Sequence, residues 1–103
     1  MIVYNLATEP NQTFEVTVNG ITLEFELRYF RDLMYATVRN AEGAVVASNV
    51  RCVNRQWLMP FSYEPAGGNF RFEDEEGRYP AYENFKTSCP LVYYSIDEIA
   101  AMS

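Results

Sequence analysis

The sequence predicts an all-β protein: a compact antiparallel β-sandwich or barrel of about seven or eight short strands with a short C-terminal helical turn. Two observations support this fold class. Apolar residues recur at every second position in several segments, which is the period of a strand with one buried and one solvated face. Gly, Asn and Pro residues separate these segments at a spacing of roughly ten residues, as in small sandwiches and barrels.

The clearest element is a hairpin near the N-terminus. Thr13–Val18 and Ile21–Tyr29 both alternate between apolar and polar side chains, and the dipeptide Asn19-Gly20 lies between them. Asn-Gly is favoured in two-residue type I′ turns because both residues tolerate positive φ. The sequence therefore predicts two paired strands with one face buried and the other, of mixed charge, exposed to solvent.

A second hairpin is expected after a short connection at 31–33. Met34–Arg39 alternates with its Met, Ala and Val residues inward. The turn sequence Asn-Ala-Glu-Gly at 40–43 then leads into a strand at Ala44–Ala47. The less regular segment Val50–Leu58 is interpreted as a further strand.

The C-terminal part is predicted to add two strands, Asn69–Glu73 and Leu91–Ile96. Tyr79–Pro90 contains two prolines and is interpreted as a loop or irregular edge, because proline donates no ladder hydrogen bond. Asp97 is expected to cap a short helix that runs through Met102. No repeat, low-complexity segment or linker is visible, so residues 1–103 are expected to form one domain.

Charge and hydropathy exclude several classes of partner. The net charge is −6, and the eight basic residues are scattered among fourteen acidic ones. Nucleic acid and anionic membrane surfaces both require clustered Lys and Arg, so neither is an expected partner. No apolar run is long enough to cross a bilayer, and no signal peptide is visible, so synthesis in the cytoplasm is expected.

The sequence lacks the residues of common catalytic sites. It contains no histidine, which excludes the usual serine and cysteine triads and histidine-based zinc sites. No GxGxxG or P-loop pattern is present. Cys52 and Cys89 are interpreted as small buried hydrophobic residues, with their proximity left open. We therefore expect no enzyme activity, cofactor or metal site.

Two groups of carboxylates have a functional and a structural interpretation. The run Glu73–Glu76, followed by Gly77, could supply oxygen ligands to calcium, but it lacks the alternating spacing of a calcium loop. A solvated hairpin tip is the favoured interpretation. Glu24 and Glu26 lie two residues apart on a predicted strand, hence on the same wet face, which does not favour a glycosidase pair.

Aromatic residues are the most informative feature for function. The chain has eight Tyr, seven Phe and one Trp. Consecutive aromatics on a strand point to opposite faces, so one of each pair tends to lie outside. Outward Tyr, Trp and Met are typical of protein interfaces, although loops that fold back over them are the alternative. The candidate interface residues are Tyr35, Trp57, Met59, Phe61, Tyr63, Tyr82 and Tyr94.

A family resemblance extends along nearly the whole chain. A strand starting with Phe, a turn with Gly and a strand ending in Leu-x-Tyr come first, here Phe14–Gly20 and Leu23–Tyr29. The later features, in order, are Asn40–Gly43, Val45-Val46, Trp57-Leu58, Gly68–Asp74, Glu76-Gly77 and Leu91–Tyr93. In this order the chain resembles the small baseplate plug proteins of contractile-tailed phages and prophages.

The resemblance implies a structural virion component of the tail baseplate. It would contact the tail hub, the spike or neighbouring tail proteins, is compatible with a homo-oligomer in the assembly, and has no enzymatic site to transfer. The alternative is a small carbohydrate- or ligand-binding β-domain that uses Trp57 and nearby tyrosines as a stacking platform. Such a domain needs a concave site, whereas an assembly protein needs a broad patch or a free strand edge.

Overall fold

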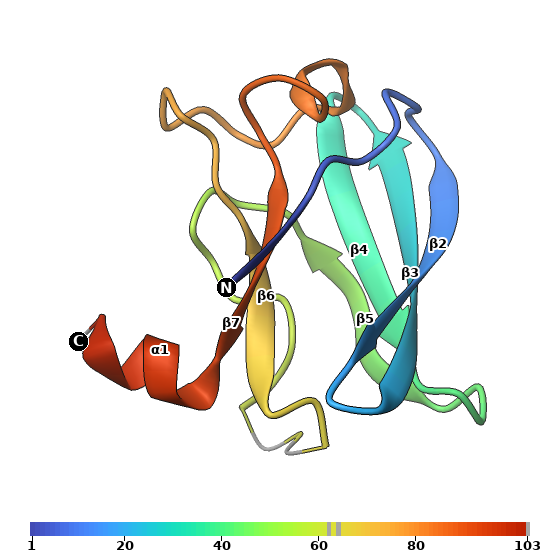
Figure 1. Cartoon of the computed structure of the whole chain (residues 1–103). Helices are drawn as coiled ribbons and strands as arrows, with labels where there is room; N and C mark the ends of the chain where they lie inside the picture. The colour runs from blue at the N-terminus through green and yellow to red at the C-terminus, as the bar shows by residue number, and fades with distance from the viewer. Residues whose placement is uncertain (62, 64, 103) are drawn as a thin grey trace.

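Two antiparallel sheets form the molecule (Figure 1). The computed structural model describes residues 1–61, 63 and 65–102. The three-stranded sheet has the order β1 (Ile2–Tyr4), β7 (Leu91–Ser95), β6 (Gly68–Phe72). The four-stranded sheet has the order β2 (Gln12–Val18), β3 (Ile21–Phe30), β4 (Leu33–Arg39), β5 (Val45–Arg51). A 3-10 turn, η1 (Tyr82–Asn84), and a helix, α1 (Ile96–Ala101), complete the described structure, and the predicted all-β fold is confirmed.

The hairpin of β2 and β3 is formed as predicted. Val18 pairs with Ile21, and the turn residues Asn19 and Gly20 have φ of 49° and 79°. The Asn19 side chain also donates to the carbonyl of Ala66 at 2.9 Å, which ties the turn to the chain leading into the other sheet. The hairpin is therefore stabilised both by its own turn residues and by a hydrogen bond to a segment outside the hairpin.

The next two connections follow from residue type as well. Phe30 pairs with Leu33 across a turn of two residues that both have positive φ, Arg31 and Asp32. At the following turn, the Asn40 side chain accepts hydrogen bonds from the backbone N–H groups at positions 42 and 44. This Asn-based turn redirects the chain from β4 into β5.

The prediction of a strand over Val50–Leu58 is wrong beyond Arg51. The N–H of Cys52 still bonds the carbonyl of Met34 at 2.8 Å, but the chain then turns, and Arg55 has a φ of 61°. β5 itself starts earlier than that segment and pairs irregularly with β4, with register shifts around Val38. The segment after β5 leaves its sheet and runs toward β6.

The two ends of the chain also differ from expectation. The sequence did not predict β1, whose three residues are too few to display a period of two. Helix α1 is capped by Ser95 and not by Asp97: the Ser95 hydroxyl accepts from the Glu98 N–H, and the Glu98 carboxylate accepts from the Ser95 N–H. The ammonium group of Met1 donates to the same carboxylate at 2.6 Å, which links β1 to α1.

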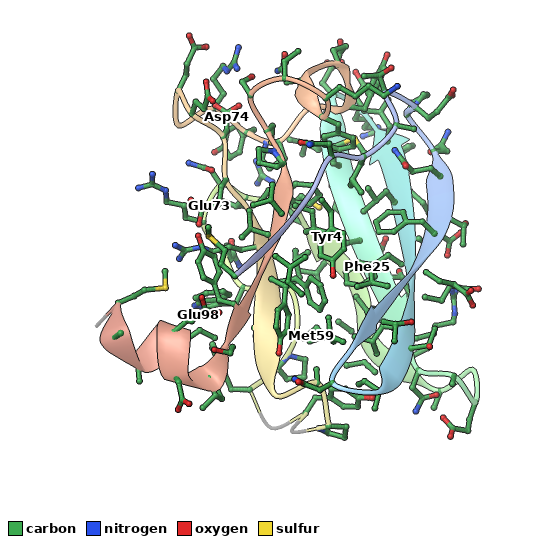
Figure 2. All side chains as sticks on the ribbon, in the orientation of Figure 1. Tyr4, Phe25, Met59, Glu73, Asp74 and Glu98 are labelled. Atoms are coloured by element: carbon green, nitrogen blue, oxygen red, sulfur yellow. The ribbon has the colours of Figure 1, made fainter. Side chains whose placement is uncertain are left out.

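Aromatic rings from both sheets fill the space between the layers. Phe25 of β3 meets Phe70 of β6 edge to face, with ring centroids 4.9 Å apart. Phe14 stacks on Phe25 at 5.4 Å, and Tyr93 contacts Phe70 at 5.1 Å. Figure 2 shows Phe25, Tyr4 and Met59 between the two sheets. Burying one such ring contributes about 2 to 3 kcal/mol, so these contacts hold the layers together.

The two cysteines match their sequence-based interpretation. Cys52 and Cys89 are buried free thiols. Burial raises the pKa of each thiol to about 12, so neither is a reactive thiolate at neutral pH.

Candidate protein-binding surfaces

The segment after β5 lies along the open edge of β6. The N–H of Arg55 donates to the carbonyl of Phe72 at 2.9 Å, and the N–H of Leu58 donates to the carbonyl of Phe70 at 3.0 Å. Between these backbone contacts the chain is not a regular strand. The edge of the three-stranded sheet is therefore covered by an irregular segment of the same chain.

A buried asparagine side chain completes this attachment. Asn69 has no exposed surface; its Oδ1 accepts from the Met59 N–H at 3.0 Å, and its Nδ2 donates to the Met59 carbonyl at 2.7 Å. The amide thus offers Met59 the donor and acceptor that a neighbouring strand would offer. This bond pair holds Trp57 close to the outer face of the sheet.

Two aromatic rings contact one guanidinium on this outer face, and a third ring packs on one of them. Strand alternation turns Phe70 and Phe72 inward and Arg71 outward. The Arg71 guanidinium lies 4.6 Å from the ring centroid of Trp57 and 5.1 Å from that of Tyr94. Each such contact contributes about 0.5 to 2 kcal/mol.

The rings also contact one another. Trp57 meets Tyr94 and Phe61 edge to face, with centroids 5.8 Å apart in both pairs. Trp57 and Tyr94 are partly buried, whereas Phe61 is 50% exposed. We call Trp57, Phe61, Arg71 and Tyr94 the arginine–aromatic cluster.

The Glu73 carboxylate contacts two members of the cluster, Arg71 and Tyr94. This carboxylate accepts hydrogen bonds from the Arg71 Nε and from the Tyr94 hydroxyl, the latter at 3.0 Å, and it forms an ion pair with the Arg55 guanidinium at 3.3 Å. Figure 2 shows Glu73 on the outer side of the three-stranded sheet. Burial, followed by the hydrogen bond to Glu73, raises the pKa of Tyr94 and keeps its phenol a donor. Ring positions in the cluster are therefore fixed before any partner arrives.

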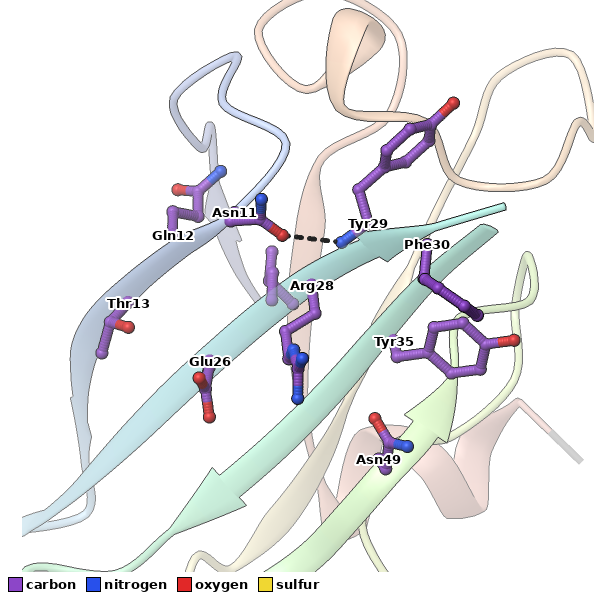
Figure 3. Close-up of a pocket in the computed structure, with 10 residues that line it drawn as sticks. Asn11, Gln12, Thr13, Glu26, Arg28, Tyr29, Phe30, Tyr35 and Asn49 are labelled. Carbon is purple, nitrogen blue, oxygen red and sulfur yellow. Dashed lines mark hydrogen bonds between the residues drawn. The ribbon is translucent and has the colours of Figure 1, made fainter. Parts of the chain in front are cut away.

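A second surface lies on the outer face of the four-stranded sheet. A shallow hollow of about 820 Å³ crosses this face, with Arg28, Phe30, Tyr35 and Asn49 among its lining residues. Figure 3 shows these side chains on neighbouring strands, with the Asn11 side chain bonded to the backbone N–H of Tyr29 at 2.9 Å. The two layers thus each present a distinct outer surface, one at the arginine–aromatic cluster and one along this hollow.

The comparison with protein families decides the identity of the chain. The family described as "Cyanophage baseplate Pam3 plug gp18" matches residues 1–97. The chain belongs to this baseplate plug family. It is therefore a structural protein of the phage tail, associated with the baseplate of the virion. A comparison with curated proteins found no match.

No helix in the described part of this plug protein is long and apolar enough to span a bilayer.

The structure brings three of the predicted interface residues of the plug protein together: Trp57, Phe61 and Tyr94. Met59 does not face outward as expected. It is 3% exposed and belongs to the core, because its backbone is bound to the Asn69 side chain.

The remaining predicted interface residues lie apart from the cluster. Tyr35 lines the hollow on the four-stranded sheet. Tyr82 packs edge to face on Tyr29 at 5.3 Å, and Tyr63 packs partly buried against the core. Arg71 and Glu73 were not among the predicted interface residues, although the alternation of Phe70, Arg71 and Phe72 indicates an outward arginine.

The acidic run of the plug protein is not the solvated tip that was predicted. Asp74 is 2% exposed and accepts from the backbone N–H groups of Glu76 at 3.0 Å and Arg78 at 2.9 Å. The Arg78 guanidinium reaches both of its carboxylate oxygens, at 3.2 Å each. Only the later part of the run, at 75–76, is exposed. Across the described residues, no three His, Cys, Asp or Glu side chains are arranged to hold a metal ion.

Asp74 makes the stability of the plug protein depend on pH. Burial alone would raise the pKa of Asp74, but the hydrogen bonds from Arg78 and Glu76 outweigh it, and the net pKa lies below 3.8. The contribution of a carboxyl with a lowered folded-state pKa is present above its unfolded pKa and is lost as the pH falls through the folded value.

We expect Asp74→Asn to destabilise the protein by about 2 kcal/mol at neutral pH, because charge-assisted hydrogen bonds are lost. The difference in stability from wild type should narrow as the pH falls through the lowered pKa of Asp74. Thermal unfolding across this pH range measures both effects. A gap that stays constant with pH would show that the Asp74 charge does not stabilise the fold.

Proposed function

We propose that this plug-family protein binds the tail hub, the spike or a neighbouring tail protein through its arginine–aromatic cluster. One observation carries this proposal: Trp57 and Tyr94 are held against Arg71 on one outer sheet face, and the exposed ring of Phe61 packs against Trp57. Trp, Tyr and Arg are the residues most enriched among those that dominate binding energies.

Preorganisation of the cluster supports the same proposal. Binding is weakened when side chains must be ordered at the interface, by about 0.5 to 1.5 kcal/mol for each flexible side chain. Here Arg71 is already fixed by Glu73 and two rings, and Trp57 by the backbone bonds of its segment. A partner would mainly cover Phe61, which is 50% exposed.

The cluster is less suited to stacking a sugar. A sugar-binding tryptophan presents a free ring face, whereas the Arg71 guanidinium lies over the Trp57 ring at 4.6 Å. The same ring also packs edge to face with Phe61 and Tyr94. A protein partner that packs beside the rings is therefore the favoured occupant.

Phe61→Ser tests this proposal, with Val45→Ser as the matched control. Phe61 and Val45 are similarly exposed, at 50% and 56%. Phe61 follows the segment attached to β6, whereas Val45 lies in β5 of the other sheet. We expect Phe61→Ser to weaken binding to a protein encoded by a neighbouring tail gene about 30-fold, as for an interface residue worth about 2 kcal/mol. Val45→Ser should bind like wild type, and neither change should lower the thermal midpoint appreciably.

Light scattering after size exclusion, with the protein alone and mixed with each tail protein, provides the measurement. A wild-type protein that enters no complex would argue against the assembly role. Equal binding by both variants would instead place the interface elsewhere on the molecule.

A further inference from the structure

The free positive charges of this acidic chain are unevenly distributed. The net charge is −6, and carboxylates engage Arg39, Arg55, Arg71 and Arg78. Among the described residues, Arg28, Arg31, Arg51 and Lys86 have no carboxylate at ion-pair distance. The three arginines lie toward one end of the four-stranded sheet, and Arg28 lines the hollow.

Strand register aligns two of these arginines with a tyrosine. Arg28 pairs with Tyr35 across β3 and β4, and Tyr35 pairs with Arg51 across β4 and β5. Side chains directly opposite in antiparallel strands share a face, with Cβ atoms about 5 Å apart. Arg28, Tyr35 and Arg51 therefore form a row across three strands, which we call the arginine–tyrosine row.

Aromatic rings border this row. Phe30 is 60% exposed and carries the Arg31 guanidinium over its ring at 5.2 Å. Tyr79 is 58% exposed and lies 4.9 Å from the Arg51 guanidinium. The hollow of about 820 Å³ runs past Arg28, Phe30 and Tyr35 (Figure 3). Positive charge and flat apolar rings therefore occur side by side.

We propose that the arginine–tyrosine row docks an acidic, extended peptide segment of another baseplate protein. Carboxylates of that segment would be bound by Arg28 and by Arg51, and an apolar side chain would lie against Phe30 and Tyr35. Arginine binds carboxylates through paired, charge-assisted hydrogen bonds, which suits it to this role. The inference goes beyond the arginine–aromatic cluster, because it assigns a separate partner to the opposite layer.

The rest of the same sheet face selects against a long polyanion. Glu15 and Glu24 lie toward its other end, and Glu26 lines the hollow itself, two residues from Arg28. Among the described residues, Arg39 alone forms ion pairs with Glu24 and Glu26. Continuous phosphates that crossed the sheet would meet these carboxylates, whereas nucleic-acid binding requires an extended basic surface. A short segment with one or two carboxylates matches the local charge.

The test measures binding of labelled peptides to the intact protein by fluorescence anisotropy. The probe is a short peptide that alternates Glu and Phe, and its comparator replaces every Glu by Gln. We expect the Glu peptide to bind at least about tenfold more tightly, with an affinity that falls as salt is added. Equal binding of the two peptides would overturn the proposal.

Variants locate the site. Arg28→Gln and Arg51→Gln should each weaken binding of the Glu peptide about tenfold. Lys86→Gln removes the same charge at an exposed position outside the row and should change binding less than about twofold. Equal losses of affinity in all three variants would show that the peptide responds only to the net charge of the protein, and would overturn the assignment.

Two further measurements exclude other occupants. Tighter binding of a single-stranded DNA oligonucleotide than of the Glu peptide would identify a nucleic-acid site, contrary to the proposal. A wild-type dimer that dissociates in the Arg28→Gln variant would identify a second copy as the occupant. That result would also contradict the proposal. Phe61→Ser should still bind the Glu peptide normally, so failure at this site is distinguishable from failure of the proposed function.

Discussion

Gly68→Ala is expected to prevent stable folding. A Cβ atom at this position would overlap the backbone carbonyl oxygen of Tyr94 and lie 2.9 Å from the Cα of Ser95. These are backbone atoms of the paired strand β7, so no side chain can rotate away to make room. Overpacking of this kind costs about 3 kcal/mol or more, a large part of the stability of a domain of this size.

Gly43→Ala provides the control for this experiment. Gly43 has a φ of 83°, but a Cβ there would meet no atom within 4 Å. Its substitution should cost only about 1 kcal/mol of backbone strain. Soluble expression and thermal unfolding of both variants measure the difference. If Gly68→Ala and Gly43→Ala lowered the stability by similar amounts, β6 and β7 would have to accommodate the added Cβ by moving apart at little cost.

Asn69→Ala is expected to release the segment that carries Trp57. The substitution removes both partners of the Met59 backbone, and an unsatisfied buried polar group costs about 1 to 3 kcal/mol. We expect a destabilisation of about 3 kcal/mol in total. Because Met59 lies close to Trp57 in the chain, the arginine–aromatic cluster should lose its fixed geometry in the molecules that remain folded.

The single tryptophan of the chain reports this change directly. In Asn69→Ala the fluorescence emission of Trp57 should shift to longer wavelength, and acrylamide should quench it more strongly, at temperatures well below unfolding. Asn54→Ala is the control, because the Asn54 side chain accepts from the Asp74 N–H at 2.7 Å, whereas the Met59 backbone is bound by Asn69. Unchanged emission in Asn69→Ala would show that the other backbone bonds suffice to hold the segment.

The parts of the fold that were predicted correctly depend on neighbouring residues. Asn19-Gly20 sets its own turn, and the alternating residues beside it define the buried face of β2 and β3. β1 was missed because its partner, β7, is almost the whole chain length away. The segment Val50–Leu58 was misassigned because its last residues bond to the backbone and side chains of β6, which no local pattern reveals.

The same distinction applies to the candidate surfaces. Residue type alone singled out Trp57, Phe61 and Tyr94, since exposed aromatics are typical of interfaces. That Arg71 joins them depends on the placement of the segment beside β6, and Met59 was misjudged for the same reason. The arginine–tyrosine row requires the register of three strands, and the irregular pairing of β4 with β5 hides that register from the sequence.

The irregular pairing of β5 limits edge-to-edge strand pairing between copies of this protein. β5 is an edge strand, and its register shifts, together with the left-handed Asn49 (φ 51°), break the even spacing of its outer N–H and C=O groups. A strand from another copy could not continue the ladder over many residues, so open-ended fibre growth from this edge is blocked. Edge-to-edge pairing of copies through β5 is therefore disfavoured by the strand itself.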